Sequence, residues 1–300
     1  MQSELHKTAL ENTHRHLLKN KLGKGRKLEK RHITSAISQT FGKFASHEFP
    51  HWFQKIVNNS YVKLMGLDMS EFHSPETYKT LNALFTRHLK EPRHFSLDAQ
   101  DFISPCDSLI SECGALVSDY ALQIKGMRYK TDELLGNNFT DAEKKKVHDG
   151  DFINFYLSPK DYHRYHVPIN MKVLKAVHIP GKFYPVNFPS LKKRLNLFIE
   201  NERVVLECET MERKRFYMVL VSALNVGVMK VSFEPRIQTD ANVIGEQVYT
   251  FKDLYLDKGE DFGCFEMGST IVILSEKGMF SEILVKAGDK VKFGDTIAKL

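Results

Sequence analysis

Two stretches of the sequence contain residues that could carry out nucleophilic chemistry. The first is GCFEMGSTIVIL, residues 263–274, in which Gly268 and Ser269 stand directly before a run of strand-forming residues. A glycine before a serine leaves the glycine carbonyl open to attack, and its backbone tolerates the strained turn that such an attack requires. The same dipeptide is also an ordinary turn that leads into a buried strand. Partners elsewhere in the chain must decide between the two interpretations.

The second stretch is YLSPKDYHRYHVPI, residues 156–169, in which His163 and His166 lie between two prolines. A zinc site is disfavoured because no third ligand follows at a suitable spacing and the helical HExxH pattern is absent. Two stacked surface histidines are one alternative. The other is a nucleophilic site, in which a carboxylate orients one imidazole while a nearby hydroxyl gives up its proton. Asp107, in the turn of ISPCDSLISECG (103–114), is the candidate carboxylate.

These stretches resemble the phosphatidylserine decarboxylases, pyruvoyl-dependent enzymes that make phosphatidylethanolamine. YLSPKDYHRYHVP, IPGKFYPVN (179–187), NERVVLECET (201–210) and FEMGSTIVIL follow one another in the order and spacing of that family. Weaker similarity extends back through TYKTLNALFTRHLKE (77–91), so that the resemblance covers roughly residues 35–300. The combination of YHRxHxP with a later GST is far more specific than either part alone.

The resemblance implies that the chain cleaves itself between Gly268 and Ser269. The family's LGST reads MGST here, and Met267 preserves the volume of leucine. The family's PADG reads PCDS, which keeps Asp107 and places the side chain of Ser108 where the family has a glycine.

Further site residues follow from the same resemblance. His166 matches the histidine that acts with the aspartate in self-processing, and His163 matches the one implicated in decarboxylation. The residues expected to bind substrate are Tyr162, Tyr184 and Asn187.

The implied chemistry needs neither metal nor pyridoxal phosphate. His166, oriented by Asp107, takes the proton from Ser269, whose hydroxyl attacks the Gly268 carbonyl and moves the acyl group from nitrogen to oxygen. Elimination and hydrolysis then turn Ser269 into a pyruvoyl group, and leave one chain of 268 residues and one of 32. The pyruvoyl ketone forms a Schiff base with phosphatidylserine and accepts the electrons that are released with carbon dioxide.

The sequence predicts an α+β protein with a helical N-terminal region and a mostly antiparallel β catalytic core. Apolar residues recur at helical spacing up to about residue 95, and SPETYKTLNALFTRHL (74–89) predicts one helix that begins at Ser74 and Pro75. Short strands are expected after about residue 100, at 151–157, 171–179, 203–208 and 216–233. We therefore expect a basic arm over 1–32, a helical membrane-associating region over 33–95 and a catalytic domain over 96–300.

The positive charge of the chain is concentrated at the N-terminus, where we expect an anionic partner to bind. Residues 1–33 hold nine Lys or Arg and three Glu, which accounts for the net charge of +6 of the whole chain. A basic arm suits an anionic membrane or a nucleic acid. Residues 1–32 contain no Phe or Tyr to stack on bases, so we expect no nucleic acid. We also expect no spanning helix, since the longest apolar stretch falls short of about 18 residues. The expected location is peripheral, on the cytoplasmic face of the cell membrane.

Two further interpretations concern the rest of the chain. FSEILVKAGDKVKFGDTIAKL (280–300) resembles half of a biotinyl or lipoyl hammerhead, which leaves a non-enzymatic carrier domain as an alternative. We expect instead that the likeness reflects a shared β architecture at the C-terminal end. The decarboxylase family implies that the two cleaved chains stay associated and form a homodimer.

Overall fold

The computed structural model describes residues 41–300 apart from 125–126, 187–195, 224–227, 238, 240–244 and 267–268. By internal contacts the chain divides into Met1–His32 and Ile33–Leu300, and all described residues belong to the second unit. The predicted basic arm, the start of the predicted helical region, Asn187 and Gly268 therefore lie outside the described residues.

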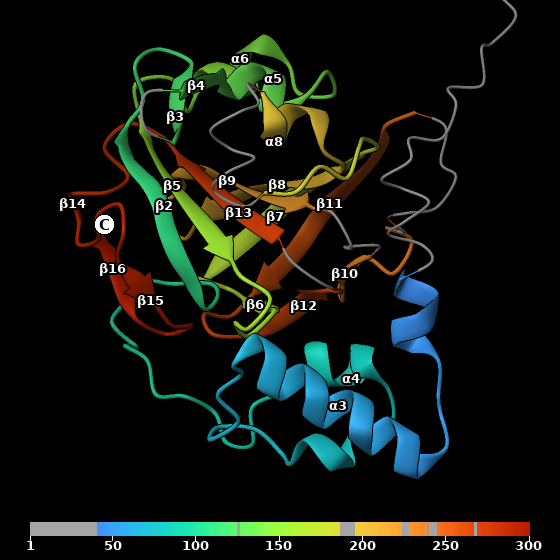
Figure 1. Ribbon diagram of the computed structural model, residues 1–300. Coiled ribbons are helices and arrows are strands. Elements are labelled where there is room, and N and C mark those ends of the chain that lie inside the picture. The colour runs from blue at the N-terminus through green and yellow to red at the C-terminus, as the bar shows by residue number, and fades with distance from the viewer. Residues whose placement is uncertain are drawn as a thin grey trace, which may run out of the picture. The chain divides into compact units, whose positions relative to one another are not determined.

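The helices are few and short (Figure 1). Those described from end to end are α3 (His51–Met65), the 3-10 helix η1 (Pro75–Thr77), α4 (Leu81–Phe85), α5 (Thr131–Leu135), α6 (Asp141–Lys145) and α8 (Leu197–Glu200). Residues 41–46 are helical as well.

Strands form most of the remaining regular structure. They are β1 (Asp101–Ile103), β2 (Ser108–Ala115), β3 (Tyr120–Ile124), β4 (Met127–Lys130), β5 (Asp151–Leu157), β6 (Arg164–His166), β7 (Met171–Ile179), β8 (Arg203–Thr210), β9 (Arg215–Ser222), β10 (Met229–Val231), β11 (Gln247–Leu256), β12 (Asp261–Phe265), β13 (Ser269–Ser275), β14 (Glu282–Ile283), β15 (Lys290–Val291) and β16 (Thr296–Lys299).

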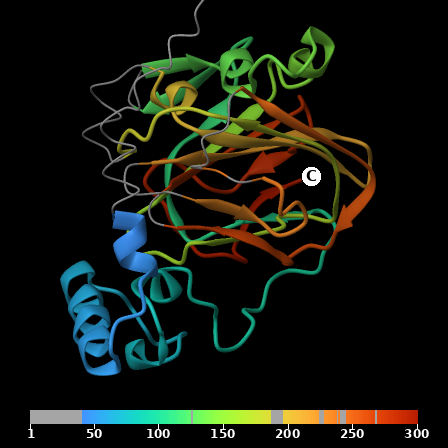
Figure 2. The same cartoon turned by 90° about the vertical axis from the view of Figure 1, so that its right-hand side faces the viewer.

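One eight-stranded antiparallel sheet organises the fold, with strand order β11-β7-β8-β9-β13-β5-β2-β15. Smaller sheets, β10-β12-β6 and β1-β16-β14, and the hairpin β3-β4 accompany it. Two views at right angles show α5, α6 and α8 at one end of the strands of the large sheet, and α3 and α4 at the other end (Figures 1 and 2). The prediction of a mostly antiparallel β core is confirmed. The hammerhead likeness over 280–300 stays a prediction.

Strand β13 lies inside the large sheet and is buried on both faces. Ile271 and Ile273 pack into one hydrophobic cluster, and Val272 and Leu274 pack into the cluster on the opposite face. This explains the uninterrupted apolar run in the sequence, because a strand that is covered on both faces needs no polar alternation. Its first residue, Ser269, pairs with Leu157 of β5 on one side and with Ser222 of β9 on the other.

The strand predictions agree with the structure where one apolar run makes one strand. The predicted strands 151–157 and 171–179 coincide with β5 and β7, and 203–208 lies within β8. The predicted strand 216–233 is wrong as a single element, because β9 ends at Ser222 and β10 begins at Met229.

The single helix predicted over 74–89 is also wrong. Residues Pro75–Thr77 form one 3-10 turn, and α4 begins separately, with the Thr80 hydroxyl accepting a hydrogen bond from the Ala83 amide. The buried Asn58 of α3 explains the break. Its Nδ2 donates at 2.9 Å both to the carbonyl of Pro75 and to that of Tyr78, which occupies oxygens that a continuous helix would use.

Among the helices of the described residues, none has both the length and the apolar character that a membrane-spanning helix requires.

We predict that Asn58→Ala destabilises the α3–α4 region, because the substitution leaves two carbonyls without their donor. A buried unsatisfied polar group costs about 1–3 kcal/mol, so the midpoint of thermal denaturation, followed by circular dichroism, should fall clearly. Asn59→Ala is the matched control, since Asn59 is exposed and donates to the carbonyl of Lys55 in its own helix. Equal midpoints for the two variants would contradict this account of the helix break.

Candidate active site

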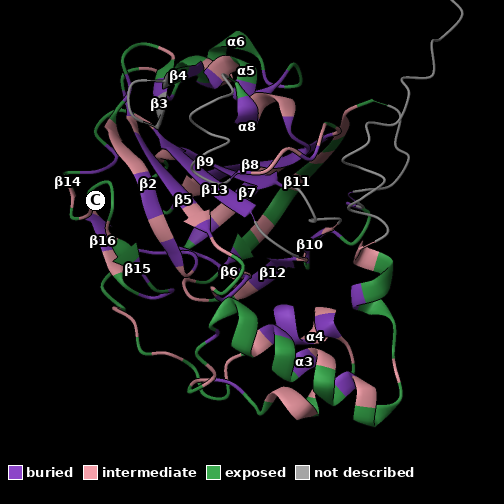
Figure 3. Cartoon of the chain, viewed as in Figure 1, coloured by how far each residue is buried: buried purple, intermediate pink, exposed green. Residues whose placement is uncertain are grey.

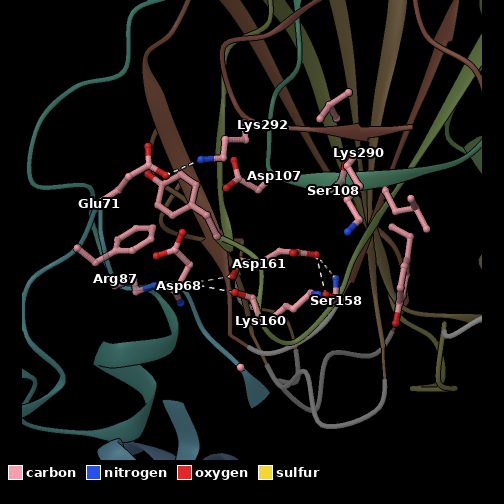
Figure 4. Close-up of a pocket in the computed structure, with 16 residues that line it drawn as sticks. Asp68, Glu71, Arg87, Asp107, Ser108, Ser158, Lys160, Asp161, Lys290 and Lys292 are labelled. Carbon is pink, nitrogen blue, oxygen red and sulfur yellow. Dashed lines mark hydrogen bonds and ion pairs between the residues drawn. The ribbon is translucent and has the colours of Figure 1, made fainter. Parts of the chain in front are cut away.

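A cavity of about 630 Å³ lies beside the start of β2, the end of β5 and β15. Its wall includes Asp107 and Tyr162, which the sequence singled out, and Arg87, which it did not. Figure 4 shows acidic and basic side chains gathered around it, among them Glu71, Asp161 and Lys292. The helical region contributes to the same wall through Gly66 at the end of α3.

Asp107 is held rigidly in the turn that precedes β2. Arg93 donates to its two oxygens at 2.5 and 3.0 Å, and the Phe293 amide donates to one of them at 2.8 Å. Arg93 also donates to both carboxylate oxygens of Glu71, at 2.8 and 2.9 Å. The hydrogen bonds from Arg93 are the largest cause that lowers the pKa of Glu71, to about 2. This arginine thus ties the loop after α3 to the turn of Asp107.

His166, at the end of β6, has both ring nitrogens engaged. Nδ1 lies 2.9 Å from the carbonyl oxygen of Gly259, which can only accept, so Nδ1 carries the proton. Nε2 therefore accepts from the Tyr162 hydroxyl at 3.0 Å. Burial lowers the pKa of His166 to about 4, which makes the ring a neutral base at physiological pH.

Asp107 and His166 are neighbours without a direct hydrogen bond between their side chains in this structure. The Phe293 ring stacks on His166 at 3.5 Å between ring centroids, while the Phe293 amide bonds Asp107. The His166 amide also donates to the carbonyl of Pro105, two residues before Asp107. The connection between the two residues therefore runs through Phe293 and the backbone, and the orienting role expected of Asp107 stays a prediction.

His163 presents a different arrangement. Its Nδ1 donates to the Asp161 carbonyl at 2.8 Å, while its fully buried Nε2 has no hydrogen-bond partner in the described part of the chain. The Phe85 ring lies 4.0 Å from the imidazole between ring centroids. Burial lowers the pKa of His163 to about 3. The residue is therefore a neutral imidazole whose lone pair is unused.

Ser269 is fully buried, and its Oγ likewise has no hydrogen-bond partner among the described residues. Backbone pairing sets His163 and Ser269 on facing segments. Ser269 pairs with Leu157, from which the chain runs through the 158–162 loop to His163, and the carbonyl of His163 accepts from the Phe265 amide. The segments 157–163 and 265–269 are thus hydrogen-bonded to each other near both of their ends. Each carries a buried polar atom without a partner, His163 Nε2 and Ser269 Oγ, whereas most buried polar atoms in proteins are hydrogen-bonded.

The remaining predicted residues have separate surroundings. Tyr184 lies outside the cavity wall, where its backbone exchanges two hydrogen bonds with the Asn201 side chain. Ser108 begins β2 with an ordinary negative φ, so the backbone freedom of a glycine is not required there. Gly268 and Asn187 lie outside the described residues.

Sequence reasoning missed Arg87, Arg93 and Phe293. Each belongs to a segment far from its partners in the chain, and no local pattern marks it.

No cluster of three or more side chains suited to hold a metal ion occurs within the described ranges.

Comparison with known proteins identifies the family of this chain. The family model for phosphatidylserine decarboxylase matches residues 81–299. A phosphatidylserine decarboxylase proenzyme of Helicobacter pylori is 46% identical over 269 residues, covering 89% of this chain and 97% of that protein. Proteins of the same name are 44% identical in Campylobacter jejuni, over 87% of this chain and 97% of the relative, and 36% identical in Shewanella sediminis, over 88% and 94%. The chain therefore belongs to the phosphatidylserine decarboxylase family.

Proposed function

We propose that this chain is a proenzyme that cleaves itself between residues 268 and 269, converts Ser269 into a pyruvoyl group and decarboxylates phosphatidylserine to phosphatidylethanolamine. The observation that carries the proposal is the buried, unpartnered hydroxyl of Ser269 at the start of β13. A hydroxyl buried without a hydrogen bond costs stability, about 1–3 kcal/mol, and such groups call for a functional explanation. The name proenzyme, carried by the relatives, supports the same conclusion. The family match gives no support to a carrier domain or a nucleic-acid-binding module.

Self-cleavage begins at Ser269. Its Oγ attacks the carbonyl carbon of residue 268, the bond from that carbon to the nitrogen of residue 269 breaks, and an ester replaces the amide. A base then removes the α-hydrogen of residue 269, and the carboxylate of residue 268 leaves. Hydrolysis of the resulting dehydroalanine releases ammonia and completes the pyruvoyl group.

We assign the first proton transfer to His166, with Asp107 as its supporting carboxylate. The neutral state of His166 and its Nε2 lone pair suit a base. The Tyr162 hydroxyl donates to Nε2 at 3.0 Å. This hydrogen bond must break before Nε2 can accept the proton of Ser269. Phe293, which stacks on His166 and bonds Asp107, supports their joint action.

We assign the later proton transfer to His163. A pyruvoyl group at position 269 supplies a ketone that condenses with the substrate amine and takes up the electron pair released with carbon dioxide. The buried environment of Ser269 fits such a small uncharged group. His163 lies on the facing segment with a free Nε2 lone pair, which can take up a proton that the substrate amine releases as it condenses, and later return that proton to the substrate carbon in place of carbon dioxide.

The proposed membrane contact rests on α3, which exposes large apolar side chains together with the basic residues Lys55 and Lys63. Its buried residues are Gln54, Asn58 and Tyr61. Trp52, Ile56 and Leu64, on the opposite side of the helix, are exposed by 66%, 54% and 80%. Figure 3 shows exposed segments along α3. An exposed apolar face on a helix is typical of insertion into a lipid interface. Since Gly66 at the end of the same helix lines the cavity, a membrane bound by α3 would lie close to the site.

Substitution of Ser269 tests self-cleavage directly. Ser269→Ala should give a folded, uncleaved and inactive chain of 300 residues, since alanine has no hydroxyl to attack the preceding carbonyl. Intact mass under denaturing conditions is the measurement. Ser275→Ala, a buried serine at the other end of the same strand, is the matched control and should still yield two chains. A fragment of 32 residues from Ser269→Ala would overturn the proposal.

Substituting each of the two histidines should impair a different reaction, self-cleavage or decarboxylation. His166→Ala should remain uncleaved because the base of the first step is gone. His163→Ala should cleave but decarboxylate about 10²–10⁴-fold more slowly, the range expected for the loss of a general acid or base. Fragment mass and release of carbon dioxide measure the two steps separately. An uncleaved His163→Ala together with a fully matured His166→Ala would reverse the assignment.

Membrane binding should depend on the exposed face of α3. Replacing Trp52 and Leu64 together by alanine should weaken cosedimentation with phosphatidylserine vesicles while leaving self-cleavage intact, because both side chains are exposed. Met211→Ala, 52% exposed in the turn between β8 and β9, is the control. Deleting residues 1–32 should additionally reduce the salt dependence of binding, by removing basic residues. Equal binding by all variants would exclude this membrane contact.

A further inference from the structure

Arg87 stands out among the cavity residues because it is buried without a carboxylate partner. It follows α4, is 2% exposed and lines the cavity beside Asp161 and Lys160 (Figure 4). No carboxylate of the described residues lies within ion-pair distance of its guanidinium, although Arg93 nearby binds two. Burying a guanidinium is costly unless other groups compensate its charge and satisfy its hydrogen bonds.

The hydrogen bonds of Arg87 leave its guanidinium incompletely satisfied. It donates to the carbonyls of Leu84 at 3.4 Å, Lys160 at 3.2 Å and Asp161 at 3.4 Å, and its Nε has no partner in the described structure.

Arg203 provides a comparison within the same molecule. It is also buried and forms no ion pair with a carboxylate of the described residues, yet each of its three nitrogens donates to a carbonyl, at distances from 2.6 to 3.2 Å. Arg203 is therefore satisfied by the fold, whereas Arg87 retains donor capacity beside a cavity.

Arg87 also adjoins the histidine assigned to decarboxylation. The carbonyl of Asp161 accepts from both the Arg87 guanidinium and His163 Nδ1. An anion held by Arg87 would accordingly lie next to the reacting part of the substrate. The guanidinium carbon of Arg87 also lies over the Phe72 ring, 4.3 Å from the ring centroid, in a cation–π contact.

The substrate offers two anions, and the chemistry of the reaction favours one of them. A cation that paired with the carboxylate would stabilise the group that must leave as neutral carbon dioxide, and would bind the ground state better than the transition state. The phosphodiester keeps its charge throughout, and only a methylene and an ester oxygen separate it from the reacting carbon. Arginine also matches the geometry of phosphate oxygens.

We infer that Arg87 binds the phosphodiester of the substrate and thereby places the serine headgroup beside His163. This inference rests on the proposed function, and it assigns to the cavity of 630 Å³ the part of the lipid that follows the reacting carbon.

Kinetics of Arg87→Gln and Arg87→Lys test the inference in the full-length, self-cleaved enzyme. Arg87→Gln should self-cleave to the extent of the parent chain but show a KM for phosphatidylserine raised about 10- to 100-fold, the range for a hydrogen bond to a charged group. Arg87→Lys keeps the charge, so its KM should lie between that of the parent enzyme and that of Arg87→Gln. Arg213→Gln removes the same charge from an exposed position in the β8–β9 turn and should leave KM unchanged.

Two probes distinguish the phosphodiester from the carboxylate. Glycerophosphoethanolamine keeps the phosphodiester and lacks the carboxylate, so Arg87→Gln should weaken its inhibition by the same factor as it raises KM. O-octanoylserine keeps the carboxylate and lacks the phosphodiester. The parent enzyme and Arg87→Gln should therefore decarboxylate it at the same rate.

Unchanged inhibition by glycerophosphoethanolamine, or an unchanged KM, would overturn the inference. So would a failure of both Arg87 variants to fold or to cleave, since Arg87 would then be a structural residue. Failure of the parent chain itself to cleave and decarboxylate would instead refute the proposed function.

Discussion

The antiparallel pairing of β13 with β5 and β9 is the constraint on which the rest of the site depends. Both faces of this strand are covered by hydrophobic clusters, so a slip by one residue would exchange every side chain between two packed interiors. The register therefore fixes Ser269 opposite Leu157. From Leu157 the chain continues into the loop that contains Asp161, Tyr162 and His163, so that one strand pairing positions Ser269 and the histidine segment together.

A second set of contacts joins segments that the sheet alone does not align. Arg93 binds Glu71 and Asp107, and Phe293 connects Asp107 to His166. These residues come from the loop after α3, the segment between α4 and β1, the turn before β2, the end of β6 and the C-terminal part of the chain. Phe293 also belongs to a buried cluster with Phe72, Ile103 and Tyr162. Ionic contacts gain strength in such surroundings, which explains how a loop-built site stays ordered.

How much of this was predictable depended on whether the determining contacts were local. The strands β5 and β7 follow from apolar runs, and the sequence placed both at their observed bounds. The helix over 74–89 failed because a side chain of another helix, Asn58, captures two of its carbonyls. The spacing of His163 and His166 marked the site, but it could not tell which imidazole nitrogen is free. That depends on the carbonyls of Asp161 and Gly259, which only the folded chain brings to the two rings. Arg87 carried no signal, since an arginine in a sequence is normally expected at the surface.

The placement of β13 to β16 has a consequence for the matured protein. The 32 residues from Ser269 onward supply β13 to the interior of the large sheet, β15 to its edge beside β2, and β14 and β16 to a sheet with β1. If the backbone is cut before Ser269 as proposed, this fragment cannot diffuse away without taking four strands out of two sheets. Release of the small chain then requires unfolding of the large one. The lifetime of the two-chain enzyme is set by its unfolding rate, independent of dilution, and the cut pieces behave in solution as a single body.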